Sequence, residues 1–124
     1  MRRILLATAA AILIATPAFA GDELMANFLG NTVIATGGMA ETHTHYKADH
    51  SFDLVGSMMG MSKTFQGTWE IKGTQLCRTY TGELPPGLPS NPLCTPWESH
   101  KVGDSWAVTM GGNTRNLTLK AGIQ

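Results

Sequence analysis

The chain has 124 residues, of which nine are basic and nine are acidic. This length fits one domain with a core of modest size. The charges are balanced and form no basic stripe that would neutralise phosphates, so we expect no nucleic-acid partner.

Residues 1–20 have the pattern of an export signal. Two arginines near the start precede an apolar run, and Ala18-Phe19-Ala20 forms a small-x-small cleavage site. The pattern predicts a secretory signal peptide over residues 1–20 and a single domain over residues 21–124, located in the periplasm or secreted. No later apolar run has membrane-spanning length, so we expect no stable membrane insertion after cleavage.

In chain order, the hydrophobic pattern changes from a helical to a strand period. Residues 22–30 predict a short helix, with Asp22 as its N-cap and Gly30 as its end. Alternation of apolar and polar residues follows, and turn residues interrupt it at short intervals. We expect strands at residues 31–36, 42–46, 51–55, 65–71, 75–81, 95–102 and 106–110, and a last strand through Leu117 and Leu119.

About eight short strands joined by tight turns indicate an all-β fold. The two architectures that fit are a small up-and-down β-barrel and a strongly curved antiparallel meander, each with a short N-terminal helix. In the clearest strand, Trp69 alternates with polar neighbours, and Trp106 does the same near the C-terminus. We therefore expect both tryptophans to be buried.

Cys77 and Cys94 are the two cysteines of the chain. In an oxidising compartment they predict a disulfide, which would close a loop containing four prolines and two glycines. The alternative is a thiolate metal site, which the absence of a Cys-x-x-Cys pair makes the weaker interpretation.

Several spaced motifs together resemble a group of small secreted β-domains, found mainly in alphaproteobacteria and of unknown function. The motifs are GNTV at 30–33, GTWEI at 67–71, LC at 76–77 with Cys94, and GDSW at 103–106. The resemblance covers most of the chain after residue 20 and implies the fold and the location, but it brings no catalytic residues. Where that group has an Asp-Gly turn, this chain has His50 after its aspartate.

The segment from residue 43 to residue 61 is rich in side chains that bind soft and borderline metals. His43 and His45 are two residues apart and share one strand face, and His50 lies in the next turn. Imidazole suits Cu(II), and thioether sulfur suits Cu(I). A tight bend at Gly56 would bring a methionine back towards His43. The candidate metal ligands are His43, His45, His50, Met58, Met59 and Met61. The alternative is that the histidines are solvated and the methionines fill the core.

The aromatic residues allow two interpretations, a pocket at the barrel mouth or an ordinary filled core. They are Phe52, Phe65, Trp69, Trp97, Trp106 and Tyr46. No nucleophile elbow, phosphate-binding loop or cofactor fingerprint is present, so we expect no enzymatic activity. Two functions remain: a binding or envelope-interaction module, whose partner is a small ligand or an envelope protein, and a periplasmic copper-binding protein. Copper is the one cofactor that the sequence suggests.

Overall fold

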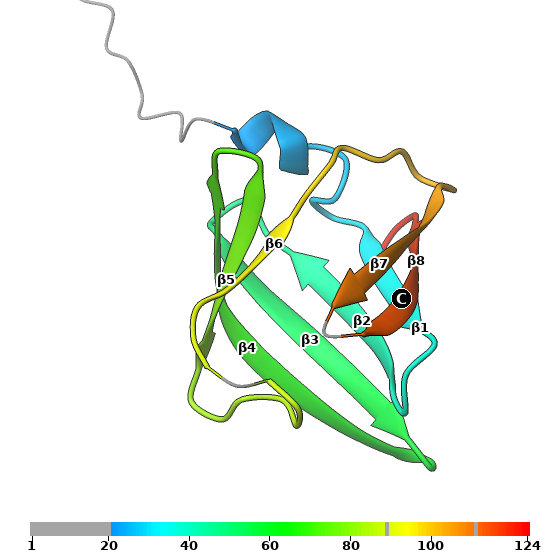
Figure 1. Cartoon of the computed structure of the whole chain (residues 1–124). Coiled ribbons are helices and arrows are strands. Elements are labelled where there is room, and N and C mark those ends of the chain that lie inside the picture. The colour runs from blue at the N-terminus through cyan, green and yellow to red at the C-terminus, as the bar shows by residue number, and fades with distance from the viewer. Residues whose placement is uncertain (1–20, 89, 111) are drawn as a thin grey trace, which may run out of the picture.

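The computed structural model describes residues 21–88, 90–110 and 112–124, so the predicted signal peptide lies outside the described residues (Figure 1). These residues form one curled half-barrel sheet of antiparallel strands in the order β6-β5-β4-β3-β2-β1-β8-β7. The strands are β1 (Thr32–Thr36), β2 (Glu41–Tyr46), β3 (Ser51–Met58), β4 (Met61–Lys72), β5 (Gln75–Thr81), β6 (Leu93–Pro96), β7 (Ser105–Met110) and β8 (Asn113–Lys120). The prediction of an all-β, strongly curved antiparallel sheet is confirmed.

The longest strand, β4, contributes Phe65, Trp69 and Ile71 to the core. Phe65, Gly67, Trp69 and Ile71 are buried and their neighbours are exposed, as expected for a strand with one face inward. A Cβ atom on Gly67 would collide with the backbone oxygen of Thr79 and lie within 2.8 Å of the Phe52 ring. Glycine at this position therefore lets β5 and an aromatic side chain approach the strand closely.

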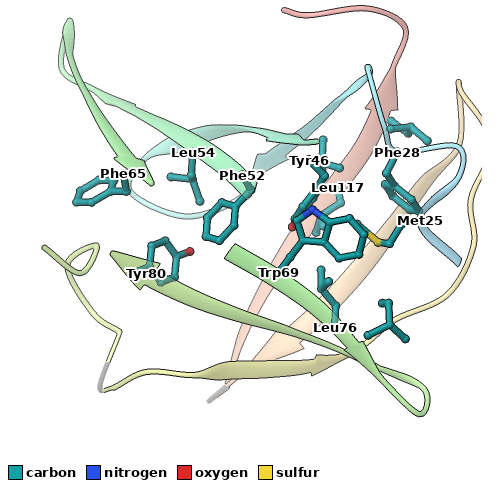
Figure 2. Packing of buried hydrophobic residues seen from close by; sticks show 13 residues of the cluster. Met25, Phe28, Tyr46, Phe52, Leu54, Phe65, Trp69, Leu76, Tyr80 and Leu117 are labelled. Carbon is teal, nitrogen blue, oxygen red and sulfur yellow. The ribbon is translucent and has the colours of Figure 1, made fainter. Parts of the chain in front are cut away.

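The inner face of the half-barrel is filled by a single hydrophobic cluster (Figure 2). Its members are Met25, Phe28, Val33, Tyr46, Phe52, Leu54, Phe65, Trp69, Ile71, Leu76, Tyr80, Leu117 and Leu119. Aromatic rings dominate its middle, and several of them meet edge to face, which is a favoured geometry for aromatic pairs. The prediction that Trp69 is buried is confirmed, since its side chain is 2% exposed.

A disulfide joins the last two strands of one sheet edge. Cys77 of β5 and Cys94 of β6 face each other directly in the strand register and are bonded. The predicted pairing is confirmed. Because β6 has only four residues, follows Pro92 and ends at Pro96, the bond supplements a short backbone ladder.

Three predicted element boundaries are wrong. The N-terminal helix is a single 3-10 turn, η1 (Asp22–Met25), which begins after Gly21. Asp22 makes no capping bond, because its carboxylate lies 2.8 Å from the His50 ring instead. The strand predicted at 95–102 is β6, which ends at Pro96, since a proline cannot donate to a continuing ladder.

The third wrong boundary is the end of β3. Gly56 does not bend the chain but pairs with Lys63 inside a regular ladder that continues to Met58. The reversal comes later, at Met59 and Gly60, which both have positive φ as a two-residue hairpin turn requires. The β3–β4 hairpin consequently extends beyond the start of β2, whose residue Glu41 pairs with Ser57.

Within the described ranges, no helix is long and apolar enough to cross a membrane.

Candidate functional site

A groove lies at the seam of the half-barrel, where the sheet ends at β6 on one side and at β7 on the other. Its volume is about 320 Å³. Pro96, Trp97 and His100 line one wall, and Trp106 and Val108 of β7 line the other. Among the described strands, β7 is hydrogen-bonded to β8 alone, so its other edge, on the groove side, has no strand neighbour there.

Phe28, from the segment after η1, connects the two walls. Its ring centroid lies 5.1 Å from that of Trp97 and 6.2 Å from that of Trp106. The His100 ring reaches the opposite wall and stacks flat on Trp106, with centroids 3.7 Å apart and an angle of 7° between the planes. A buried phenylalanine therefore positions two indoles and an imidazole around one apolar hollow.

The groove also has polar groups on its lining. The indole Nε1 of Trp97 is buried and has no hydrogen-bond partner among the described residues. His100 lies 3.6 Å from Asp104 through its Nδ1 atom, and its backbone oxygen accepts a hydrogen bond from Asn27. The exposed side chains of Glu98 and Thr109 complete the lining, which therefore combines two indoles and an imidazole with a carboxylate and a hydroxyl group.

The structure divides the six aromatic residues singled out in the sequence into two sets. Tyr46, Phe52, Phe65 and Trp69 are buried in the core, whereas Trp97 and Trp106 are half-buried and line the groove. The prediction that Trp106 is buried is therefore wrong, although its strand phase is right. It faces inward opposite Leu117, but β7 is an edge strand and no further strand covers it.

His43 and His45 share one strand face, as predicted, and this face is the outer one. His43 Nδ1 and His45 Nε2 lie 3.3 and 3.2 Å from the same atom, the backbone oxygen of Gln124. The remaining ring nitrogens lie 3.0 Å from Glu41 and 2.7 Å from Asp53. Each histidine is therefore engaged by an acidic side chain and by the C-terminal segment.

His50 lies apart from these two histidines, at the opposite end of β3 from the methionines. Its backbone has a φ of 69°, a conformation that glycine adopts without strain and that other residues adopt rarely. Its ring stacks on Trp69, with centroids 4.0 Å apart, and its Nε2 atom lies 2.8 Å from Asp22. His50 thus links the turn to the core and to η1.

The three methionines of the candidate metal site lie on the β3–β4 hairpin. Met58, Met59 and Met61 are 44%, 92% and 77% exposed, so they are not core filler. The bend at Gly56 that would return them to His43 is absent. No group of three His, Cys, Asp or Glu side chains suited to a metal occurs in the described part of the chain, and copper binding remains a prediction.

Arg78 is a candidate residue that the sequence interpretation missed. It lies on the inner face of β5 between the buried Leu76 and Tyr80, directly opposite Trp69 of β4. Its guanidinium contacts the Tyr46 side chain and lies 5.9 Å from the centre of the Tyr80 ring. The sequence did contain a sign of this burial. On a strand with alternating faces, Arg78 is in phase with the apolar residues Leu76 and Tyr80, so it is expected on the same inner face.

Burial raises the pKa values of Tyr46 and Tyr80 above the usual 10.0, and it does so despite the opposing effect of Arg78. Both phenols are therefore neutral near pH 7. The interior around Arg78 holds a permanent cation beside two neutral hydroxyl groups.

Comparison with protein-family models, with curated proteins and with solved structures found no match for this chain.

Proposed function

We propose that this chain is an exported binding module that takes a small ligand with an aromatic or apolar group into the seam groove and has no catalytic role. The observation that carries the proposal is the position of Trp97 and Trp106. Both indoles are half-buried. They lie on opposite walls of a hollow of about 320 Å³. An aromatic side chain left incompletely covered at a concave site favours a ligand as its missing neighbour.

A small ligand suits the groove better than an envelope protein does. The volume is near the lower end of the range for small-molecule sites, about 300–1,000 Å³. Protein interfaces bury about 800 Å² on each partner, and the lining residues come from one short strand and one short connection. A groove of this size accommodates one or two rings.

The test uses phenylnaphthylamine, a neutral apolar dye whose fluorescence rises on leaving water. We expect the protein from residue 21 onward to bind the dye, and Val108→Glu to abolish binding because a charge would enter the apolar lining. Val102→Glu is the matched control, since Val102 is 49% exposed and outside the groove lining. Equal binding by both variants, or none by the unaltered protein, would contradict the proposal.

Copper binding is the second candidate function, and the exposed methionines favour it. Three thioethers lie within four residues on one hairpin, and Met59 occupies a positive-φ position where Asn, Asp or Gly would be the ordinary choice. Thioether sulfur is a ligand for Cu(I) rather than for Zn²⁺. Methionine is unfavourable in this backbone conformation, so a functional role of the side chain would explain why it occurs there.

The copper proposal is tested by titration with Cu(I) under reducing conditions that leave the disulfide intact. We expect the triple variant Met58→Leu/Met59→Leu/Met61→Leu to lose uptake, and His43→Ala/His45→Ala to retain it. Cu(II) uptake that depends on the two histidines would instead locate the site on the outer face of β2. Equal, weak uptake by all three proteins would refute copper binding.

A further inference from the structure

The charges at the seam groove are mainly negative. Among the described residues, its lining contains the carboxylate of Glu98 and no lysine or arginine. Asp104 adds a second carboxylate, 3.6 Å from the Nδ1 atom of His100. Lys101, the cation nearest to Glu98 in the chain, is exposed and outside the lining. The groove therefore complements a positively charged ligand better than a negatively charged one.

Glu98 lies where the chain leaves β6, and its neighbour Trp97 fixes the backbone there (Figure 1). The Trp97 backbone N–H donates to the backbone oxygen of Thr74 at 2.9 Å, and its ring packs against Phe28. The Glu98 side chain is exposed and forms no ion pair within the described ranges. Glu70 of β4 is exposed and unpaired there as well, so exposure alone does not mark a site. What distinguishes Glu98 is its place in a groove lined by two indoles.

The two indoles supply a surface that attracts cations. The face of an indole is electron-rich, and tryptophan attracts a cation more strongly than the other aromatic side chains do. Trp97 and Trp106 lie on opposite walls, and each is half-buried, so part of each ring is accessible. A quaternary ammonium ion has no N–H donors to satisfy and a charge shielded by alkyl groups. It therefore enters a hollow of this kind at a lower desolvation cost than a primary ammonium ion.

We propose that the ligand of the seam groove is a small organic cation, a quaternary ammonium ion with an apolar or aromatic body. Its ammonium group lies against Trp97 and Trp106, and the carboxylate of Glu98 faces it from the exposed side of the lining. Aromatic rings recognise quaternary ammonium groups in this way in aromatic cages. This inference rests on the proposed binding function and adds the chemical class of the ligand.

The experiment compares a cation with a neutral molecule of the same shape. Phenyltrimethylammonium and tert-butylbenzene differ only in that a positively charged nitrogen replaces a carbon atom. Each competes with phenylnaphthylamine for the groove, and the loss of dye fluorescence gives its affinity. For the unaltered protein from residue 21 onward, we expect the cation to bind about fivefold more tightly than the neutral molecule, because the indoles and the carboxylate attract its charge.

Glu98→Gln removes the charge and keeps the size of the side chain. We expect the ratio of the two affinities to fall about threefold at low ionic strength, as for the loss of one exposed ion pair, while the affinity for tert-butylbenzene is unchanged. Glu70→Gln is the matched control, because it changes the net charge equally but lies on β4, outside the groove lining. This control should leave the ratio as it is in the unaltered protein. Added salt should lower the ratio for the unaltered protein more than for Glu98→Gln.

Each outcome decides between the proposals. The same affinity ratio in Glu98→Gln and Glu70→Gln overturns the role of Glu98. Binding of tert-butylbenzene by the unaltered protein as tightly as the cation, or more tightly, overturns the inference about a cation and leaves the binding function standing. Binding of neither the dye nor the two competitors overturns the binding function itself.

Discussion

His50 and Met59 are the two non-glycine residues with positive φ among those that the structure describes, and each lies in a hairpin turn. This conformation costs an L-residue about 1–3 kcal/mol relative to glycine or asparagine. His50 offsets the cost through its stack on Trp69 and its contact with Asp22. Met59 is 92% exposed, so its side chain gives little compensation within the fold.

We therefore predict that Met59→Asn stabilises the protein by about 1 kcal/mol, because asparagine tolerates the left-handed region. Urea unfolding followed by circular dichroism measures the change. Met61→Asn is the control, because Met61 is also exposed but lies in the regular ladder of β4, where asparagine has no such advantage. No gain for Met59→Asn over Met61→Asn would show that the turn is not strained.

Asp49 makes the β2–β3 turn sensitive to acid. The Ser51 hydroxyl and then the Ser51 backbone N–H donate to its carboxylate, at 2.5 and 2.9 Å, and these bonds hold the pKa of Asp49 below its usual 3.8. A lowered pKa in the folded state means that the contribution to stability is present above the unfolded value and is lost as the pH falls through the folded one.

The resulting prediction concerns Asp49→Ala. Its melting temperature should be lower than that of the unaltered protein at about pH 6, and the gap should close as the pH drops below 3.8. Ser51→Ala should reproduce part of the gap, because the backbone N–H of residue 51 remains a donor. A gap of the same size at low pH would contradict the proposed hydrogen bonds.

Among the elements, β6 depends most on a covalent bond. It has four residues, pairs with β5 alone, and is followed by the groove wall at Pro96 and Trp97. The disulfide holds this edge at Cys94, directly opposite Cys77. The shape of the groove is therefore linked to the redox state of the two cysteines.

Replacing both cysteines by serine should lower the free energy of unfolding by about 3 kcal/mol, the loop-entropy estimate for a closed loop of this length. Chemical denaturation measures this loss. We also expect weaker binding of phenylnaphthylamine, because the wall carrying Trp97 loses its attachment. Retained dye affinity with reduced stability would show that the wall is held by its packing on Phe28 instead.

The sequence predicted the elements whose side-chain alternation is strong and local. It gave β4 and β5 in the right phase, and it paired Cys77 with Cys94. It failed where backbone pairing decides the boundary. Gly56 stays in a strand because Lys63 pairs with it across the hairpin, and η1 ends at Met25, shortly before Leu29 forms a bridge with Tyr46.

The candidate site was only partly predictable for the same reason. Trp97 and Trp106 were recognised as possible ligand contacts, but the sequence did not distinguish them from the aromatic residues of the core. That distinction depends on which strand is the edge of the sheet, and strand order is a property of the whole fold. Arg78 was missed because its isolation from carboxylates appears only after the strands are assembled.

For the molecule as a whole, the curled sheet leaves its two edges, β6 and β7, on either side of the groove rather than bonded to each other. As a result, Trp69 and Trp106 lie in different environments. Trp69 is packed from all sides in the middle of the sheet, whereas Trp106 lies at the seam.

This difference in environment predicts different losses of stability for the same substitution to alanine. Trp69→Ala should destabilise the protein by about 3–5 kcal/mol, the range for a large aromatic residue removed from a core. Trp106→Ala should cost clearly less and should instead reduce the affinity for phenylnaphthylamine. Thermal unfolding and dye titration on both variants measure the two effects. A larger loss of stability for Trp106→Ala would mean that the seam, not the sheet centre, holds the fold together.

The pairing of β1 with β8 also constrains how the protein folds. Residues 32–36 bond to residues 116–120, so the two strands most distant in the chain lie side by side in the interior of the sheet. During synthesis the ribosome makes β1 first and β8 last, so the β1–β8 ladder cannot form until the whole chain has been made. Such non-local pairing slows folding, because a long loop must close first. Formation of the native sheet should therefore follow, rather than accompany, synthesis of the chain.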